Sequence, residues 1–62
     1  MTYTVVWLKG ETVLATTNFD DLSPAKRHAK EHFPIQKNRR GATAVEVRDD
    51  QGVRHFLHGD ER

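Results

Sequence analysis

The chain contains no cysteine, although it is only 62 residues long. A chain of this length forms one small domain, and domains of this size are marginally stable unless something reinforces their core. Disulfides and thiolate metal sites are excluded here, because both need cysteine. The fold must therefore rest on one core of sheet and helix, with self-association as an additional source of stability.

The first 17 residues predict a β-hairpin. Residues 2–8 are rich in β-branched and aromatic side chains, as is typical of a strand, and residues 11–17 resume the pattern after Gly10. Val6 and Trp7 lie on opposite faces of the first strand. The hairpin register stays open between a two-residue loop and a bulged three-residue loop, and a shift of one residue would exchange the faces presented to the core.

Residues 23–33 predict one short amphipathic helix. Ser23-Pro24 is typical of a helix start, with Asp21 as the alternative cap. Phe33-Pro34 predicts its end, because the residue before proline avoids the α region. Residues 34–42 are then expected to form an exposed basic loop. The apolar stripe of the helix is narrow, which predicts close packing on a sheet, and it consists of Leu22, Ala25, Ala29 and Phe33.

A second hairpin is predicted from residues 43–49 and 53–58, joined by a type I turn over Asp49-Asp50-Gln51-Gly52, which favours a bulged hairpin. In this register Leu57 lies on one face, together with Val45, Val47, Val53 and His55. Phe56 lies on the opposite face, together with Glu46, Arg48 and Arg54. Arg48 opposite Arg54 is unfavourable unless an acidic group such as Glu46 lies nearby. Residues 59–62 are expected to form a frayed tail.

These elements predict an α+β fold of order ββαββ, in which two β-hairpins form an antiparallel four-stranded sheet with one helix on one face. Three segments carry a resemblance to a known group of proteins, and they are Trp7-Leu8-Lys9-Gly10, Phe19-Asp20-Asp21-Leu22 and Val45-Glu46-Val47-Arg48-Asp49. Through them the chain resembles small uncharacterised bacterial single-domain ββαββ proteins of unknown function. The resemblance implies the fold and transfers no functional residue.

Basic residues concentrate in the middle of the chain. Residues 26–40 carry a net charge of +5, whereas the whole chain carries +1. A polyanion or nucleic acid needs several basic side chains on one surface, and this segment offers Lys26, Arg27, Lys30, Lys37, Arg39 and Arg40. A solvated helix face is the simpler interpretation, since the isoelectric point of about 8.2 is below that of dedicated nucleic-acid binders. Weak polyanion binding is the alternative.

His28-Ala29-Lys30-Glu31-His32 matches the H-x-x-E-H pattern of one class of zinc peptidase. Two histidines four residues apart share a helix face and can bind zinc. The chain is too short to add a substrate cleft, so local packing of the two rings is the simpler interpretation. A structural or adventitious metal site, assisted by His55 or His58, is the alternative. We expect no cofactor and no metal.

No feature of the sequence indicates an enzyme. The chain has a single serine, Ser23, which is expected to cap the helix, and the paired aspartates occur at turns or caps, where aspartate is common. A 62-residue monomer also has little material to enclose a small-molecule substrate. The sequence lacks the basic segment and apolar run of a signal peptide and any apolar stretch of membrane-spanning length, so a cytoplasmic protein without membrane contact is expected.

A small binding module is therefore the leading hypothesis. One helix covers one face of a sheet, so the other face is expected to contact an unknown protein partner or a second copy of the chain. The residues assigned to this contact are Phe56, Arg48 and Arg54, with Trp7 or Val6 according to the register.

Overall fold

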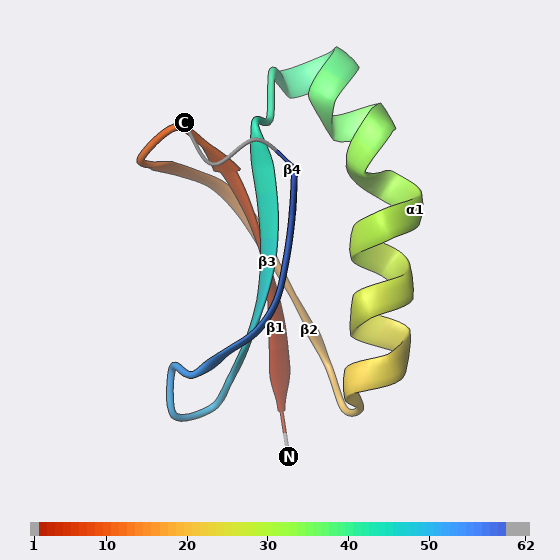
Figure 1. Ribbon diagram of the computed structural model, residues 1–62, viewed down its shortest axis with the longest axis vertical. Coiled ribbons are helices and arrows are strands. Elements are labelled where there is room, and N and C mark those ends of the chain that lie inside the picture. Colours follow the sequence, from red (N-terminus) through yellow and green to blue (C-terminus); the bar gives the residue numbers. More distant parts are fainter. Residues whose placement is uncertain (1, 60–62) are drawn as a thin grey trace.

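The computed structural model describes residues 2–59 and contains five elements in the order ββαββ (Figure 1). All strand pairs are antiparallel, and they form one open sheet in the order β2-β1-β3-β4. The predicted α+β fold is confirmed. Gly59 belongs to the last strand and not to a tail, and residues 60–62 lie outside the described part. The elements are β1 (Tyr3–Lys9), β2 (Thr12–Phe19), α1 (Leu22–Arg40), β3 (Ala44–Asp49) and β4 (Arg54–Gly59).

The molecule has two layers, with α1 lying along one face of the sheet (Figure 1). No element among residues 2–59 covers the other face. The strand pairing decides which side chains point to this uncovered side, because directly opposed residues share a face. We call this surface the open face and define it by Thr4, Val6, Leu8, Val13, Glu46, Arg48, Arg54 and Leu57.

The core is small and lies between α1 and the two central strands. Val5 and Trp7 of β1 are buried against α1, and Trp7 is only 2% exposed. Ala25 and Ala29 of the predicted stripe are fully buried, and their short side chains allow α1 to lie close to the sheet. Val45 and Val47 of β3 complete the buried cluster. Trp7 is thus a core residue, and its assignment to the open face is wrong, because Val6 is the β1 residue there.

Helix α1 is longer than the sequence pattern predicts, since it begins at Leu22, after Asp21 at the cap position, and continues through Pro34 to Arg40. The expected basic loop over residues 34–42 is therefore mostly helical. Pro34 removes one backbone hydrogen bond, but the residues after it are mostly good helix formers, and three basic side chains in the last turn complement the helix dipole. The helix ends at Gly41, whose φ of 72° is left-handed and whose N–H donates to the Lys37 carbonyl at 3.1 Å.

The first hairpin has a two-residue loop, which settles the register that the sequence left open. Lys9 pairs with Thr12, so the loop consists of residues 10–11, and a separate β-bulge lies further along, beside Trp7. Thr43 fastens this loop to the start of β3, because the Gly10 N–H donates to Thr43 Oγ1 at 2.8 Å and the Thr43 N–H donates to the Leu8 carbonyl at 2.7 Å.

The second hairpin has the predicted turn but a different register beyond it. The Gly52 N–H donates to the Asp49 carbonyl at 3.0 Å, as a type I turn requires. Arg54 pairs with Arg48, but the next pair is Phe56 with Val47, so His55 is an extra residue in β4. A β-bulge of this kind shifts the alternation of all later side chains.

The bulge corrects the sequence-based assignment of two apolar side chains. Phe56 pairs with Val47 and packs against the core, on the side of α1. Leu57 pairs with Glu46 and lies on the open face. The predicted positions of Phe56 and Leu57 are therefore wrong, whereas those of Arg48 and Arg54 on the open face are confirmed.

Candidate functional site

The open face combines apolar side chains with charged ones. Val6, Leu8 and Leu57 are each partly exposed there, and Val13 on edge strand β2 is 55% exposed. All four strands therefore contribute to this face, with apolar side chains on β1, β2 and β4 and with Glu46 of β3 between Val6 and Leu57. Contiguous apolar surface that is interspersed with arginine is typical of protein interfaces.

Glu46 lies in the middle of this face and is only 3% exposed, although no layer covers it within the described residues. Its carboxylate contacts Arg48 Nη2 at 2.7 Å, and its second oxygen lies 3.9 Å from Arg54 Nη1. Arg48 and Arg54 are directly opposed across β3 and β4, and their side chains are 50% and 56% exposed. Glu46 therefore relieves the repulsion between two arginines, as the sequence suggested.

The two guanidinium groups keep binding capacity beyond Glu46. An arginine carries five N–H donors, and one shared carboxylate satisfies only part of those on Arg48 and Arg54. Both side chains are half exposed, so their remaining donors are accessible from the open face. The arrangement can accept carboxylate or carbonyl oxygens from a second molecule.

A second group of side chains lies where α1 meets β4. Lys26 Nζ is 5.8 Å from the centre of the Phe56 ring, a cation–π distance. The His58 ring lies 5.1 Å from that of Phe33 and 6.3 Å from that of Phe56. Helical periodicity places Lys30 on the same flank of α1. We call this group the α1–β4 strip and define it by Lys26, Lys30, Phe33, Lys37, Phe56 and His58.

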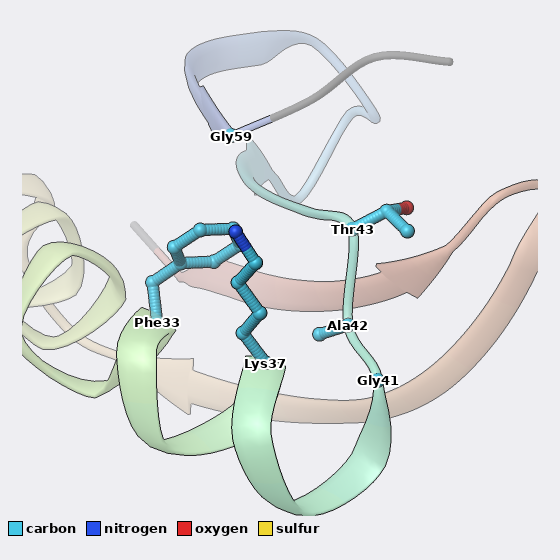
Figure 2. A pocket seen from close by; sticks show the side chains of 6 residues that line it. All are labelled: Phe33, Lys37, Gly41, Ala42, Thr43 and Gly59. Atoms are coloured by element: carbon cyan, nitrogen blue, oxygen red, sulfur yellow. The ribbon is translucent and has the colours of Figure 1, made fainter.

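The α1–β4 strip ends in a pocket of about 350 Å³. Figure 2 shows the Phe33 ring and the Lys37 side chain extending from α1 toward the segment that leads into β3. A side chain at Gly59 would fill part of this space, because a Cβ there would come within 2.7 Å of Phe33 Cζ. The lining residues are Phe33, Lys37, Gly41, Ala42, Thr43 and Gly59.

The six basic residues of the sequence-predicted polyanion surface all lie on α1, but they do not form one patch. At 100° per residue, Lys26, Lys30 and Lys37 fall within about 40° of one another on the helix surface. Arg27 and Arg39 are about 100° and 140° away from Lys26 on either side. Arg40, the last residue of α1, is about 40° from Lys26 on the side away from Lys30. The structure therefore divides the predicted set into a lysine row beside β4, two arginines that project elsewhere, and Arg40 at the end of the helix.

His28 and His32 pack against each other on the flank of α1 that faces β2. Their ring centres are 4.2 Å apart, and the His28 ring also lies 5.0 Å from that of Phe19 and 6.1 Å from that of Trp7. Burial lowers the pKa of His28, and His32 lowers it further, against an opposing effect of Glu31. Within residues 2–59, no group of three or more potential metal-ligating side chains is arranged around one point.

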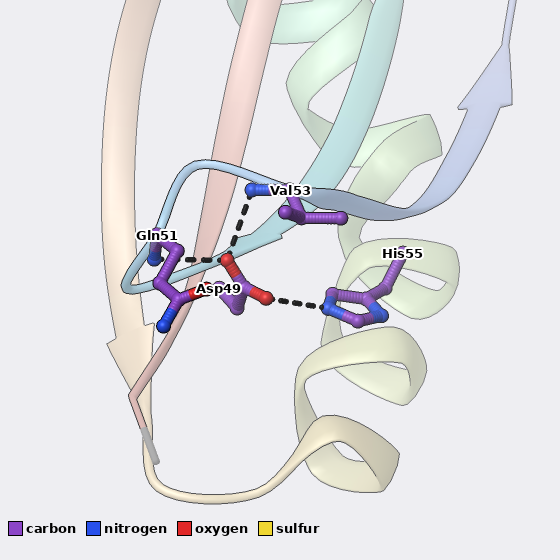
Figure 3. Close-up of polar contacts among 4 residues, drawn as sticks. All are labelled: Asp49, Gln51, Val53 and His55. Carbon is purple, nitrogen blue, oxygen red and sulfur yellow. Dashed lines mark hydrogen bonds and ion pairs between the residues drawn. The ribbon is translucent and has the colours of Figure 1, made fainter.

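Asp49 organises the β3–β4 turn (Figure 3). Its Oδ1 accepts hydrogen bonds from the backbone N–H groups of Gln51 and Val53, both at 2.9 Å. Its Oδ2 lies 2.9 Å from His55 Nε2. The contact with His55 and these backbone donors lower the pKa of Asp49. The predicted turn role of Asp49 is thus confirmed, and its contact with the bulge residue His55 was not predicted from the sequence.

The fold and these surfaces define a small α+β domain with one open sheet face. In comparisons with protein families, with curated proteins and with solved structures, the chain has no significant match. The resemblance to small bacterial ββαββ proteins therefore stays a prediction. In the part of the chain that the structure describes, no helix has both the length and the apolar character that crossing a membrane requires.

Proposed function

We propose that this protein is a small, non-enzymatic cytoplasmic binding module that self-associates through its open face. The observation that carries the proposal is the composition of this face. Val6, Leu8 and Leu57 surround the nearly buried Glu46, and two half-exposed arginines flank it. Apolar side chains at the centre with arginine beside them match the anatomy of protein interfaces.

A second copy of the chain suits this face for two reasons. Glu46 already offsets one of the two guanidinium charges of this face, so two identical faces that meet around a two-fold axis bring together apolar side chains with one net positive charge from this triad on each side. The sheet-on-sheet packing that results is a common two-layer arrangement. Dimerisation would also bury additional apolar surface. This would stabilise a chain that is too short to bury much surface on its own and has no cysteine to form disulfides.

The size of the face sets the expected strength of the dimer. Strands of about seven residues in a four-stranded sheet present roughly 450 Å² on one side, so a dimer would bury roughly 900 Å² in total. This area is below that of stable complexes and within the range of transient ones. We therefore expect a weak dimer that exchanges rapidly with the monomer.

The test is sedimentation equilibrium over a range of protein concentrations, with the change Leu57→Glu. The wild-type chain should show a concentration-dependent dimer, and Leu57→Glu should be monomeric throughout, because an additional carboxylate without an arginine of its own would have to be desolvated within the interface. Ile35→Glu is the matched control, since Ile35 is 45% exposed on α1 and lies away from the open face. A monomeric wild-type chain at millimolar concentration, or an equal effect of Ile35→Glu, would contradict the proposal.

A further inference from the structure

We propose that the α1–β4 strip binds single-stranded nucleic acid, a role independent of self-association through the open face. The strip is on the opposite side of the sheet from the open face. It combines three lysines in a row with the exposed His58 ring and the partly buried rings of Phe33 and Phe56. Single-stranded nucleic acid is recognised by this combination, in which cations follow the backbone and aromatic rings stack on bases.

The lysine row has the length of an oligomer site. Lys26 and Lys37 are eleven residues apart on a helix, which corresponds to about 16 Å, and Lys30 lies between them. A single phosphate or a mononucleotide would reach only part of this row. A chain of phosphates can contact all three ammonium groups, and this favours a polymer as the ligand.

The aromatic side chains of the strip border the lysine row. Lys26 Nζ sits over the Phe56 ring at 5.8 Å, and the exposed His58 lies between Phe56 and Phe33. Phe33 forms a wall of the pocket of about 350 Å³ at the end of the strip, next to Lys37. An unstacked base can contact these rings while its phosphate contacts a lysine, whereas the bases of a duplex are not available for stacking.

Among residues 2–59, no ion pair involves a lysine of the α1–β4 strip. Glu31 is about 140° from Lys26 around the helix, so it points away from the strip. Asp49 is engaged by His55 and by two backbone N–H groups of its own turn. Both described ion pairs that involve arginine are on the open face. The positive charge along this flank of α1 is therefore available to a ligand.

The test is fluorescence anisotropy with a labelled single-stranded oligonucleotide of mixed sequence and about 12 nucleotides, within the range of single-strand site sizes. If three phosphates are contacted, the logarithm of the association constant should fall with the logarithm of the salt concentration with a slope of about −2. The double variant Lys26→Gln/Lys30→Gln should bind about 25-fold more weakly at 0.1 M salt, with a slope of about −0.7.

The matched control is Arg27→Gln/Arg39→Gln, which removes the same charge from the same helix but outside the strip. It should change the affinity by less than about twofold. A second variant, Phe56→Leu, keeps an apolar side chain in the core and should weaken binding at least about fivefold through the loss of stacking. Circular dichroism of each variant should show the wild-type fold.

Three outcomes would overturn this proposal. The first is the absence of binding by the wild-type chain at low salt, and the second is an equal loss in the arginine control. The third is unchanged affinity of Phe56→Leu combined with equally tight binding of heparin, because this would indicate a surface for any polyanion. Loss of oligonucleotide binding would leave the dimer intact, so this proposal and the open-face proposal fail separately.

Discussion

At the scale of single residues, Glu46 is the most informative position in the molecule. It is almost fully buried on a face that no other described element covers, between Val6 and Leu57 on the neighbouring strands and within 4 Å of two arginine side chains. A charged group in such a place is tolerated only when it is paired. Glu46 therefore makes an arginine pair across β3 and β4 compatible with the fold.

We expect Glu46→Gln to lower the free energy of unfolding by about 1 kcal/mol, because it removes the charge that offsets two arginines whose ends are half exposed. Urea unfolding would measure this change. Arg48→Gln alone should also destabilise the protein, but it should cost much less in the Glu46→Gln background. Additive effects of the two changes would show that the 2.7 Å contact does not contribute to stability.

The depressed pKa of His28 predicts how stability responds to acid. Since the folded state holds the proton on His28 less tightly than the unfolded state does, the free energy of unfolding should fall as the pH drops from 7 through the ordinary histidine range. The fall should level off below the folded-state pKa. His28→Gln should reduce this dependence in denaturant titrations at several pH values, and an unchanged profile would refute the assignment to His28.

At the scale of elements, the sequence predicts the structure correctly wherever a short sequence pattern alone determines the local conformation. The valine alternation in β3, the Asp49–Gly52 turn and the alanine stripe of α1 each follow from a local pattern, and each is present. Two features could not be predicted from such patterns. Pro34 did not end α1, since its cost is spread over a helix with good formers after it, and the bulge at His55 has no local sequence signal.

The residues of the candidate surfaces were predicted correctly only where they precede the β-bulge in β4. Arg48 and Arg54 come before the bulge, so strand alternation placed them correctly. Phe56 and Leu57 come after it, so alternation placed both on the wrong face. The lysine row needed the full length of α1, because Lys37 joins Lys26 and Lys30 only when the helix continues past Pro34.

The interior proline of α1 gives a prediction about helix stability. Pro34→Ala restores a backbone N–H that can donate to the Lys30 carbonyl and should stabilise the protein by about 1–3 kcal/mol. Pro24→Ala is the control, because Pro24 is in the first turn, where a missing N–H costs little. Thermal unfolding would compare the two variants, and a loss of stability in Pro34→Ala would show that the proline fits its site without cost.

At the scale of the whole molecule, the protein is a thin two-layer domain in which, among residues 2–59, Trp7 is the one aromatic side chain that is buried, while other large side chains pack around it and stay partly exposed. A core of this size leaves little margin of stability. The uncovered side of the sheet is the place where further burial is available. Stability and self-association should therefore be coupled in this protein.

This coupling should appear in thermal unfolding. With a dissociation constant on the order of 100 µM, raising the protein concentration from about 10 µM to about 1 mM should stabilise each protomer by roughly 1 kcal/mol and raise Tm by about 5 °C. Leu57→Glu should have the same Tm at both concentrations. If the wild-type Tm does not change with protein concentration, self-association does not stabilise the fold and the proposed coupling is wrong.

The extra residue in β4 has a consequence for any attempt to redesign this domain. Deleting His55 would restore simple alternation along the strand and turn Phe56 and His58 outward while Leu57 turned inward. One deletion would thus dismantle both proposed binding surfaces without altering a single charged side chain on either of them. His55 therefore sets the side-chain orientation on both faces of β4, so an insertion or deletion there would change the open face and the α1–β4 strip together.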